Sequence, residues 1–259
     1  MHRLYVYSST GNSLALAEGL GRRLGACELI NMARHPEKEE RVSGETVGLV
    51  FPVHAFGLPS VVRRFMERLS TDGASVYLLP NSAGMPLGAS ALAETVLRRR
   101  GLSVRAAFHV TMAGNYPPLS NPPSGRKRQN LADRGERALD AVAEAVREGR
   151  EVSPPGRALR ALSEFINGKA FERVSGEDRR FFADENCVGC GLCAELCPVG
   201  NIVLEGKRPR WLHRCVGCFA CFHWCPQKAL QYNRSSSAGR NRYNHPAVSL
   251  DRYRRWCRE

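Results

Sequence analysis

Residues 6–20 read VYSSTGNSLALAEGL, which is the end of an apolar strand, a polar turn and the start of an amphipathic helix. The turn from Ser8 to Ser13 carries hydroxyl and amide side chains, and Gly11 allows the backbone to approach a ligand closely. Free backbone N–H groups and the positive end of a helix dipole favour an anion at such a turn. The turn contains no lysine, unlike a P-loop, so we interpret it as a site that binds a phosphate monoester without cleaving it. An ordinary helix N-cap is the alternative that the short motif leaves open.

Apolar runs alternate with helical periods over the first 150 residues, which predicts a parallel α/β sheet. The runs are continuous enough for strands that are buried on both faces. We expect these strands at residues 3–8, 27–32, 46–53, 75–81 and 104–112. Residues 33–45 are polar and predict little or no helix, and residues 113–129 predict a long Pro-rich loop.

Eight of the ten cysteines lie between Cys187 and Cys225, in the runs CVGCGLCAELCP and CVGCFACFHWCP. Both runs have the spacing C-x2-C-x2-C-x3-C-P, which is typical of iron–sulfur ligands in two-cluster ferredoxins. Zinc is the alternative, but zinc sites use pairs of C-x2-C motifs rather than two runs of four cysteines. We expect a hairpin between the two runs, carrying Trp211.

Three segments of the first half resemble the cofactor loops of flavodoxins: SSTGNS, FPVHAFGLPSVVRRFMERL and NSAGMPLG. The resemblance implies FMN, with the ring stacked on Phe56 and with Tyr116 on its opposite face, although Tyr116 could instead only pack its loop. His54 is a candidate protonation switch near the flavin, but a loop histidine without a partner is more often inert. The implied phosphate contacts are Ser8, Ser9, Thr10, Gly11, Asn12 and Ser13, and the implied ring contacts are His54, Ala55, Phe56, Gly57, Ser82, Ala83, Gly84 and Tyr116.

The whole chain resembles the flavodoxin–ferredoxin fusion family (EFR-type ferredoxins), and the segment RYNHPAVSL at residues 242–250 shares in the likeness. In such two-cluster modules the fourth cysteine of each run ligates the other cluster. The resemblance therefore implies two 4Fe–4S clusters. One has the ligands Cys187, Cys190, Cys193 and Cys225, and the other has Cys197, Cys215, Cys218 and Cys221.

The expected fold is α/β, with a flavodoxin-like, doubly wound, five-stranded parallel sheet followed by a small α+β two-cluster ferredoxin-like domain. We place the FMN-binding domain at residues 1–149, a linker with a short amphipathic helix at 150–182, the 2×4Fe–4S domain at 183–233 and a basic tail at 234–259. The large domain is expected to have its own core. The linker helix would dock one domain on the other through the apolar residues Leu159, Leu162, Phe165 and Ile166.

The formal net charge of +13 comes mostly from arginines that are spread along the chain. The balance stays basic after the negative charges of clusters and flavin are added, which suits an acidic redox partner, such as a ferredoxin or flavodoxin, or a reductase. Arg126–Arg128 on the Pro-rich loop is the expected docking cluster. The triplets at 98–100 and 126–128 also raise a nucleic-acid hypothesis, but the first ends a helix, where cations favour the dipole, and we do not expect a nucleic-acid partner.

The leading functional hypothesis is an electron-transfer protein that passes single electrons between two 4Fe–4S clusters and FMN, and on to a redox partner. One alternative is an FMN-dependent reductase of a small molecule, and another is a redox-sensing or nucleic-acid-binding protein. Whether the chain is an enzyme stays open at this point. No apolar stretch is long enough for a membrane span, and the clustered thiols fit a cytoplasmic location.

Overall fold

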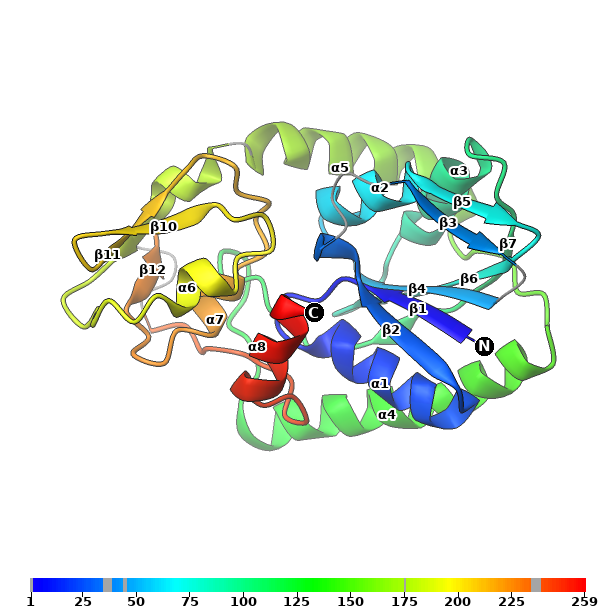
Figure 1. Ribbon diagram of the computed structural model, residues 1–259, viewed down its shortest axis with the longest axis horizontal. Coiled ribbons are helices and arrows are strands. Elements are labelled where there is room, and N and C mark those ends of the chain that lie inside the picture. The colour runs from blue at the N-terminus through cyan, green and yellow to red at the C-terminus, as the bar shows by residue number, and fades with distance from the viewer. Residues whose placement is uncertain (1, 35–38, 44–45, 175, 234–238) are drawn as a thin grey trace.

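A parallel sheet forms the centre of the computed structural model, which describes residues 2–34, 39–43, 46–174, 176–233 and 239–259. Its strands are β1 His2–Val6, β2 Cys27–Asn31, β4 Thr46–Pro52, β6 Ser75–Ser82 and β7 Val104–Ala107, in the order β2-β1-β4-β6-β7. Numbered among the sheet strands alone, this order is 2-1-3-4-5, the doubly wound arrangement of flavodoxin-like folds. The expected fold class of the first half is confirmed (Figure 1).

The last expected strand, 104–112, is interrupted. β7 ends at Ala107, and the two-residue β8, Val110–Thr111, pairs with the far end of β6. Sequence reasoning also missed a parallel pair outside the main sheet, β3 Glu40–Ser43 and β5 Leu69–Asp72. Within the polar segment 33–45, the short helix η1 (Met32–Arg34) and β3 agree with the expectation of little helix, and residues 35–38 and 44–45 lie outside the described residues.

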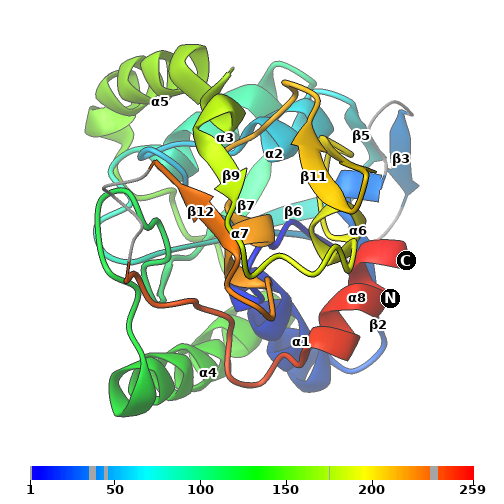
Figure 2. The same cartoon turned by 90° about the vertical axis from the view of Figure 1, so that its left-hand side faces the viewer.

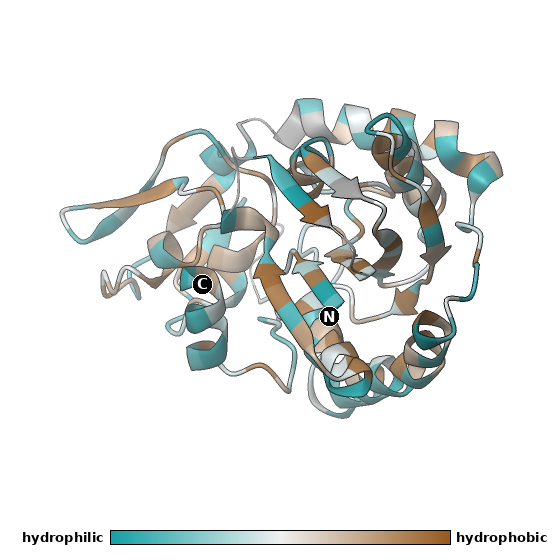
Figure 3. Cartoon of the chain, turned by 45° about the vertical axis from the view of Figure 1, so that its right-hand side comes forward, coloured by the Kyte–Doolittle hydropathy of each residue, from teal (hydrophilic) through white to brown (hydrophobic). Residues whose placement is uncertain are grey.

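Helices cover both faces of the sheet because alternate strand residues point to opposite sides. Leu4 and Val6 of β1 pack in the core beneath α1 (Asn12–Leu24) and α4 (Gly125–Arg147), whereas Tyr5 packs in the core beneath α2 (Ser60–Met66) and α3 (Ala89–Arg98). In Figure 3, brown apolar residues follow the central strands and teal residues mark the outer helix faces. No helix in the described ranges is long and apolar enough to cross a bilayer.

The Pro-rich segment is shorter than expected because α4 begins at Gly125. Arg126, Lys127 and Arg128 therefore lie in the first turn of a helix rather than on a loop, and Arg128 donates a bond of 3.5 Å to Asn244. None of the three lines the large cavity at the end of the sheet. The expected loop position of the Arg126–Arg128 cluster is therefore wrong, and its docking role stays a prediction.

The cysteine-rich part is a small α+β unit, as expected. Its antiparallel pairs are β10 Ile202–Glu205 with β11 Arg208–Trp211, the expected hairpin, and β9 Phe181–Ala183 with β12 Leu230–Tyr232. Its short helices are η3 Glu177–Arg180, α6 Leu192–Glu195 and α7 Ala220–His223. The rings of Phe181, Phe219, Phe222 and Tyr232 form a local aromatic core.

A second core joins this unit to the sheet. Trp224 of the cysteine-rich part and Tyr253 and Trp256 of the tail pack in the same buried cluster as Leu4 and Leu14. The tail forms a helix, α8 Leu250–Arg258, that sequence reasoning did not predict, and Asn31 at the end of β2 donates 2.9 Å to the Trp256 carbonyl. On this side the two halves therefore share one hydrophobic core. Residues 234–238 of the tail lie outside the described ranges.

The linker helix, α5 Arg160–Val174, spans both halves on the side opposite α8 (Figures 1 and 2). Its expected apolar contact is wrong: Leu162 and Phe165 are exposed. The helix docks instead through two buried polar side chains. Ser163 Oγ accepts a bond of 2.7 Å from Gly88 N, and Asn167 Nδ2 donates to the carbonyls of His54, at 2.9 Å, and Leu58, at 3.3 Å.

We expect Asn167→Ala to lower the free energy of unfolding by about 1–3 kcal/mol, because the Leu58 carbonyl loses its side-chain donor and the His54 carbonyl keeps only Gly57 N. Denaturant unfolding measures the change. Glu172→Ala on the same helix removes only an exposed ion pair with Lys169 and serves as the control. Equal stabilities for the two variants would contradict the assignment of Asn167 as the docking residue.

Candidate functional site

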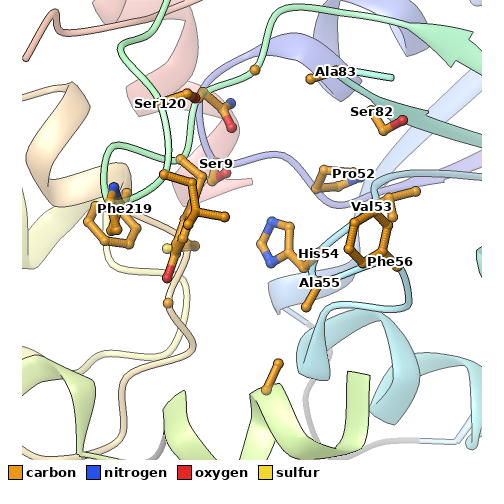
Figure 4. Close-up of a pocket in the computed structure, with 18 of the residues that line it drawn as sticks. Ser9, Pro52, Val53, His54, Ala55, Phe56, Ser82, Ala83, Ser120 and Phe219 are labelled. Atoms are coloured by element: carbon orange, nitrogen blue, oxygen red, sulfur yellow. The ribbon is translucent and has the colours of Figure 1, made fainter. Parts of the chain in front are cut away.

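A cavity of about 1500 Å³ lies at the carboxyl ends of the strands, between the sheet, α5 and the cysteine-rich part. Doubly wound sheets place their ligands at this edge. Most of the expected flavin-site residues line it: Ser8, Ser9, Thr10, Asn12, Ser13, His54, Ala55, Phe56, Ser82, Ala83, Gly84 and Tyr116. Figure 4 labels Ser9, His54, Ala55, Phe56, Ser82 and Ala83 among them. Gly11 and Gly57 belong to the same turns but do not line the cavity.

The turn at residues 8–13 is a buried set of hydrogen-bond donors. Asn81 Nδ2 donates 2.9 Å to Ser13 Oγ, and Asn115 Nδ2 donates 2.5 Å to Thr10 Oγ1. Because each hydroxyl oxygen already accepts a bond from the protein, its own proton is free for an anion in the cavity. Together with the first amides of α1, this arrangement suits a bound anion and needs no lysine.

Two residues of this turn have structural roles as well. The Asn12 side chain donates 3.2 Å to the Ala113 carbonyl and accepts 2.7 Å from Tyr243 Oη, so it ties the turn to the 113–120 loop and to the tail. Gly11 adopts a left-handed φ of 93°, and a Cβ there would lie 3.1 Å from Cβ of His245 and of Val248. A larger residue at position 11 would therefore push the tail away.

The turn at residues 54–57 holds strained backbone beside the cavity. Reciprocal bonds join His54 and Gly57, and both residues between them have positive φ, 46° at Ala55 and 59° at Phe56. This geometry, which normally favours Gly or Asn, leaves Phe56 45% exposed at the cavity (Figure 4). A Cβ on Gly57 would lie 2.4 Å from Asn167 Cγ, so close contact with α5 requires glycine there.

Burial lowers the pKa of His54 to about 4, so its imidazole is neutral at neutral pH. The ring of Tyr7, at the end of β1, lies 6.4 Å from it, edge to face. In this environment His54 does not change its charge between pH 6 and 8. A protonation switch at this residue is therefore not supported by its surroundings.

The other wall of the cavity combines the 82–84 and 113–120 loops with the cysteine-rich part. Ser82 Oγ donates 2.6 Å to the Gly84 carbonyl, and His109 Nε2 lies 2.8 Å from the same hydroxyl. Tyr116 is 42% exposed and packs edge to face on Phe219, at 5.2 Å. Sequence reasoning missed the parts played by His109 and Phe219. Phe219 directly follows the motif cysteine Cys218, which was its only signal, and His109 fell inside the strand expected at 104–112.

The eight motif cysteines form two groups, each drawn from both runs. Cys187, Cys190, Cys193 and Cys225 line a second, small cavity with apolar neighbours such as Leu192 and Leu230. Cys197 lies close to Cys215, Cys218 and Cys221, and burial, followed by the nearby thiols of Cys197 and Cys215, raises the pKa of Cys218. The grouping coincides with the one that the resemblance implies, while ligation itself stays a prediction.

Backbone amides point at sulfur atoms of the second group. Asn201 N donates 3.2 Å to Cys197 Sγ, and Gly217 N donates 3.3 Å to Cys215 Sγ. Such bonds stabilise thiolates, the form that binds metal. Cys218 of this group also lines the large cavity, next to Phe219, whereas Cys190 of the first group is exposed to solvent. One group thus faces the cavity and the other faces outward.

Comparison with known proteins supports this description of the cysteine-rich part. Two family descriptions match, both named 4Fe-4S binding domain, at residues 182–203 and 215–229. A search of curated protein sequences found no match.

Solved structures resemble the first half only loosely. Two-electron reduced flavodoxin of Megasphaera elsdenii is 15% identical, with a TM-score of 0.35 over 56% of this chain and 100% of that one. The Trp repressor binding protein of Bacillus subtilis is 14% identical, with a TM-score of 0.34 over 55% of this chain and 95% of that one. The strand order, rather than these scores, is the basis for the flavodoxin-like fold. The chain thus joins a flavodoxin-like sheet to 4Fe–4S ferredoxin motifs, which is the combination of an electron-transfer redox protein.

We expect Ala55→Gly to raise the free energy of unfolding by about 1 kcal/mol, because glycine removes the penalty of the left-handed backbone. The matched control is Ala161→Gly on the exposed face of α5. This change should lower the free energy of unfolding by about 0.5–1 kcal/mol. Chemical denaturation of both variants measures the two changes. A loss of stability in Ala55→Gly would show that the turn is not strained.

Proposed function

We propose that the protein transfers single electrons between two 4Fe–4S clusters and one FMN, and on to a redox partner. The observation that carries the proposal is that Cys218 and the anion-binding turn at residues 8–13 line one cavity. When bound, a flavin exchanges one or two electrons and a cubane cluster exchanges one, so the pair interconverts one- and two-electron chemistry. The chain's own task is to hold the two kinds of cofactor close together and to exclude water between them.

The large cavity is lined both by the hydroxyl-rich turn at residues 8–13 and by aromatic side chains, which are the two kinds of contact that FMN requires. Ser9, Thr10 and Ser13 would hold the phosphate with hydroxyl and backbone donors. Phe56 would cover one face of the flavin, and Tyr116 stands across the cavity for the other. Residues Ser82 to Gly84 would border the ring edge. These roles follow from the chemistry of the residues that line the cavity.

The two cysteine groups fit clusters for different reasons: the four outer thiols line a small apolar cavity, and the four inner thiols lie close together with backbone amides donating to two of them. The group of Cys187, Cys190, Cys193 and Cys225 would hold the outer cluster. The group of Cys197, Cys215, Cys218 and Cys221 would hold the inner one, beside the flavin. Electrons would enter or leave at Cys190, which is exposed, and reach the cavity at Cys218.

An acidic redox protein is the partner that the outer group's surroundings favour. Val188 and Leu204 are 62% and 40% exposed beside Cys190, and the turn and second strand of the β10–β11 hairpin add Lys207 and Arg208 at the surface. An apolar centre with a basic rim is complementary to an acidic carrier and would steer its approach. The free thiols suit a reducing compartment such as the cytoplasm.

The size of the cavity favours a second candidate function, the flavin-dependent reduction of a small molecule. At about 1500 Å³ the cavity exceeds the roughly 300–1,000 Å³ typical of single-ligand sites. Exposed apolar side chains gather at its walls, among them Met85, Leu119 and Phe165. Turnover of an apolar acceptor by the reduced protein, competing with transfer to a protein carrier, would favour this function. No contact in the described residues specifically favours nucleic acid.

We expect Cys190→Ala and Cys218→Ala each to lose about half of the bound iron, since each removes one ligand of a four-thiol set. Both variants should also slow flavin reduction by an external low-potential donor, followed by stopped-flow absorbance under anaerobic conditions. Cys27→Ala, which lies outside both groups, is the matched control and should keep full iron and full rate. Retention of all iron in either test variant would contradict the ligand assignment.

We expect Thr10→Ala to weaken FMN binding roughly 10- to 100-fold, because a buried hydrogen bond to a charged phosphate contributes about 1.5–3 kcal/mol. Riboflavin, which lacks the phosphate, should bind both proteins weakly and almost equally. Fluorescence quenching measures both ligands. Thr95→Ala is the control, since its hydroxyl bonds only the Ala91 carbonyl within α3. Equal binding of FMN and riboflavin to the wild type would contradict the assignment of this turn as the phosphate site.

A further inference from the structure

The back of the turn at residues 8–10 is held by the last third of the chain. Three consecutive carbonyl oxygens each accept one bond: Ser8 from Tyr253 Oη at 2.8 Å, Ser9 from Trp224 Nε1 at 2.9 Å and Thr10 from His245 N at 2.9 Å. All three donors are more than 200 residues away in sequence. The turn's own neighbours supply none of these bonds.

These bonds set the direction of the turn's amides. In a planar trans peptide the N–H points opposite to the preceding C=O. Anchoring the carbonyls of Ser8 and Ser9 toward Tyr253 and Trp224 therefore directs the amides of Ser9 and Thr10 away from them, toward the cavity that both residues line. The amide of Gly11 is used differently, since it donates 3.2 Å to Ser8 Oγ. Two backbone donors are thus fixed before any anion arrives.

The donors themselves are rigid. The Trp224 and Tyr253 rings stack at 4.5 Å and 12°, and they are only 6% and 1% exposed. Trp224 directly precedes Cys225, which lines the small cavity of the outer cysteine group. It also follows α7, which begins two residues after Cys218. The indole that holds Ser9 is therefore part of the chain segment that carries the cysteines.

We propose that Trp224 and Tyr253 are positioning residues that preset the turn for the FMN phosphate, so that phosphate affinity depends on the assembled cysteine-rich part. This inference rests on the proposed function. Binding free energies are reciprocal: if cluster loading strengthens FMN binding, FMN strengthens cluster retention by the same factor. The FMN phosphate and the clusters are then coupled sites.

Trp224→Phe and Tyr253→Phe test the positioning role, since each keeps a ring and removes one donor. We expect each to weaken FMN binding about tenfold and to change riboflavin binding less than twofold, because the lost bond acts only on the phosphate end. Arg254→Gln is the matched control: it removes an ion pair between α8 and Glu195 but no bond to the turn. Equal losses for the two ligands, or no loss, would overturn the proposal.

Iron release tests the coupling without any measurement of turnover. Excess FMN should slow the loss of iron from the wild-type protein to a chelator, and riboflavin should protect less. The protection should disappear in the Trp224→Phe Tyr253→Phe double variant. Protection that persists in the double variant, or none in the wild type, would reject the coupling. Failure of the wild type to bind FMN at all would reject the proposed function instead.

Discussion

The stack of Trp224 on Tyr253 is the contact on which the arrangement of the molecule depends. The indole comes from the cysteine-rich part, the phenol from the tail helix, and both donate to the carbonyls of the turn that follows β1. Their rings continue the core that begins under the sheet. This buried contact therefore ties the turn at residues 8–13 to the chain segment that carries the cysteines.

Local sequence patterns correctly predicted the elements whose structure depends mainly on neighbouring residues. The five main strands, the polar turn after β1 and the two cysteine runs each carry their signal within about fifteen residues. The β7–β8 interruption and the start of α4 at Gly125 could not be predicted, since they depend on pairing with β6 and on packing against α1. The prediction of how α5 docks was wrong for a different reason. An apolar stripe predicted the buried face of the helix, but Ser163 and Asn167 bond to backbone groups outside the helix, which no pattern within the helix reveals.

The strained turn at residues 54–57 and the polar docking of α5 depend on the same contacts. Gly57 has no side chain, so Asn167 approaches closely enough to bond the carbonyls of His54 and Leu58. Those bonds hold the turn while Ala55 and Phe56 remain in an unfavourable conformation. The result is an aromatic ring that is kept at the cavity wall rather than withdrawn into the core.

The three carbonyl anchors also impose an order on biosynthesis. Ser8 to Thr10 are made more than 200 residues before Trp224, His245 and Tyr253, so the turn lacks its anchors while the sheet around it begins to fold. A chain interrupted before these residues would contain the strands of the parallel sheet without the three bonds that orient this turn. The turn therefore reaches its final geometry only after both cysteine runs have been made, because Trp224 lies within the second run and Tyr253 follows it.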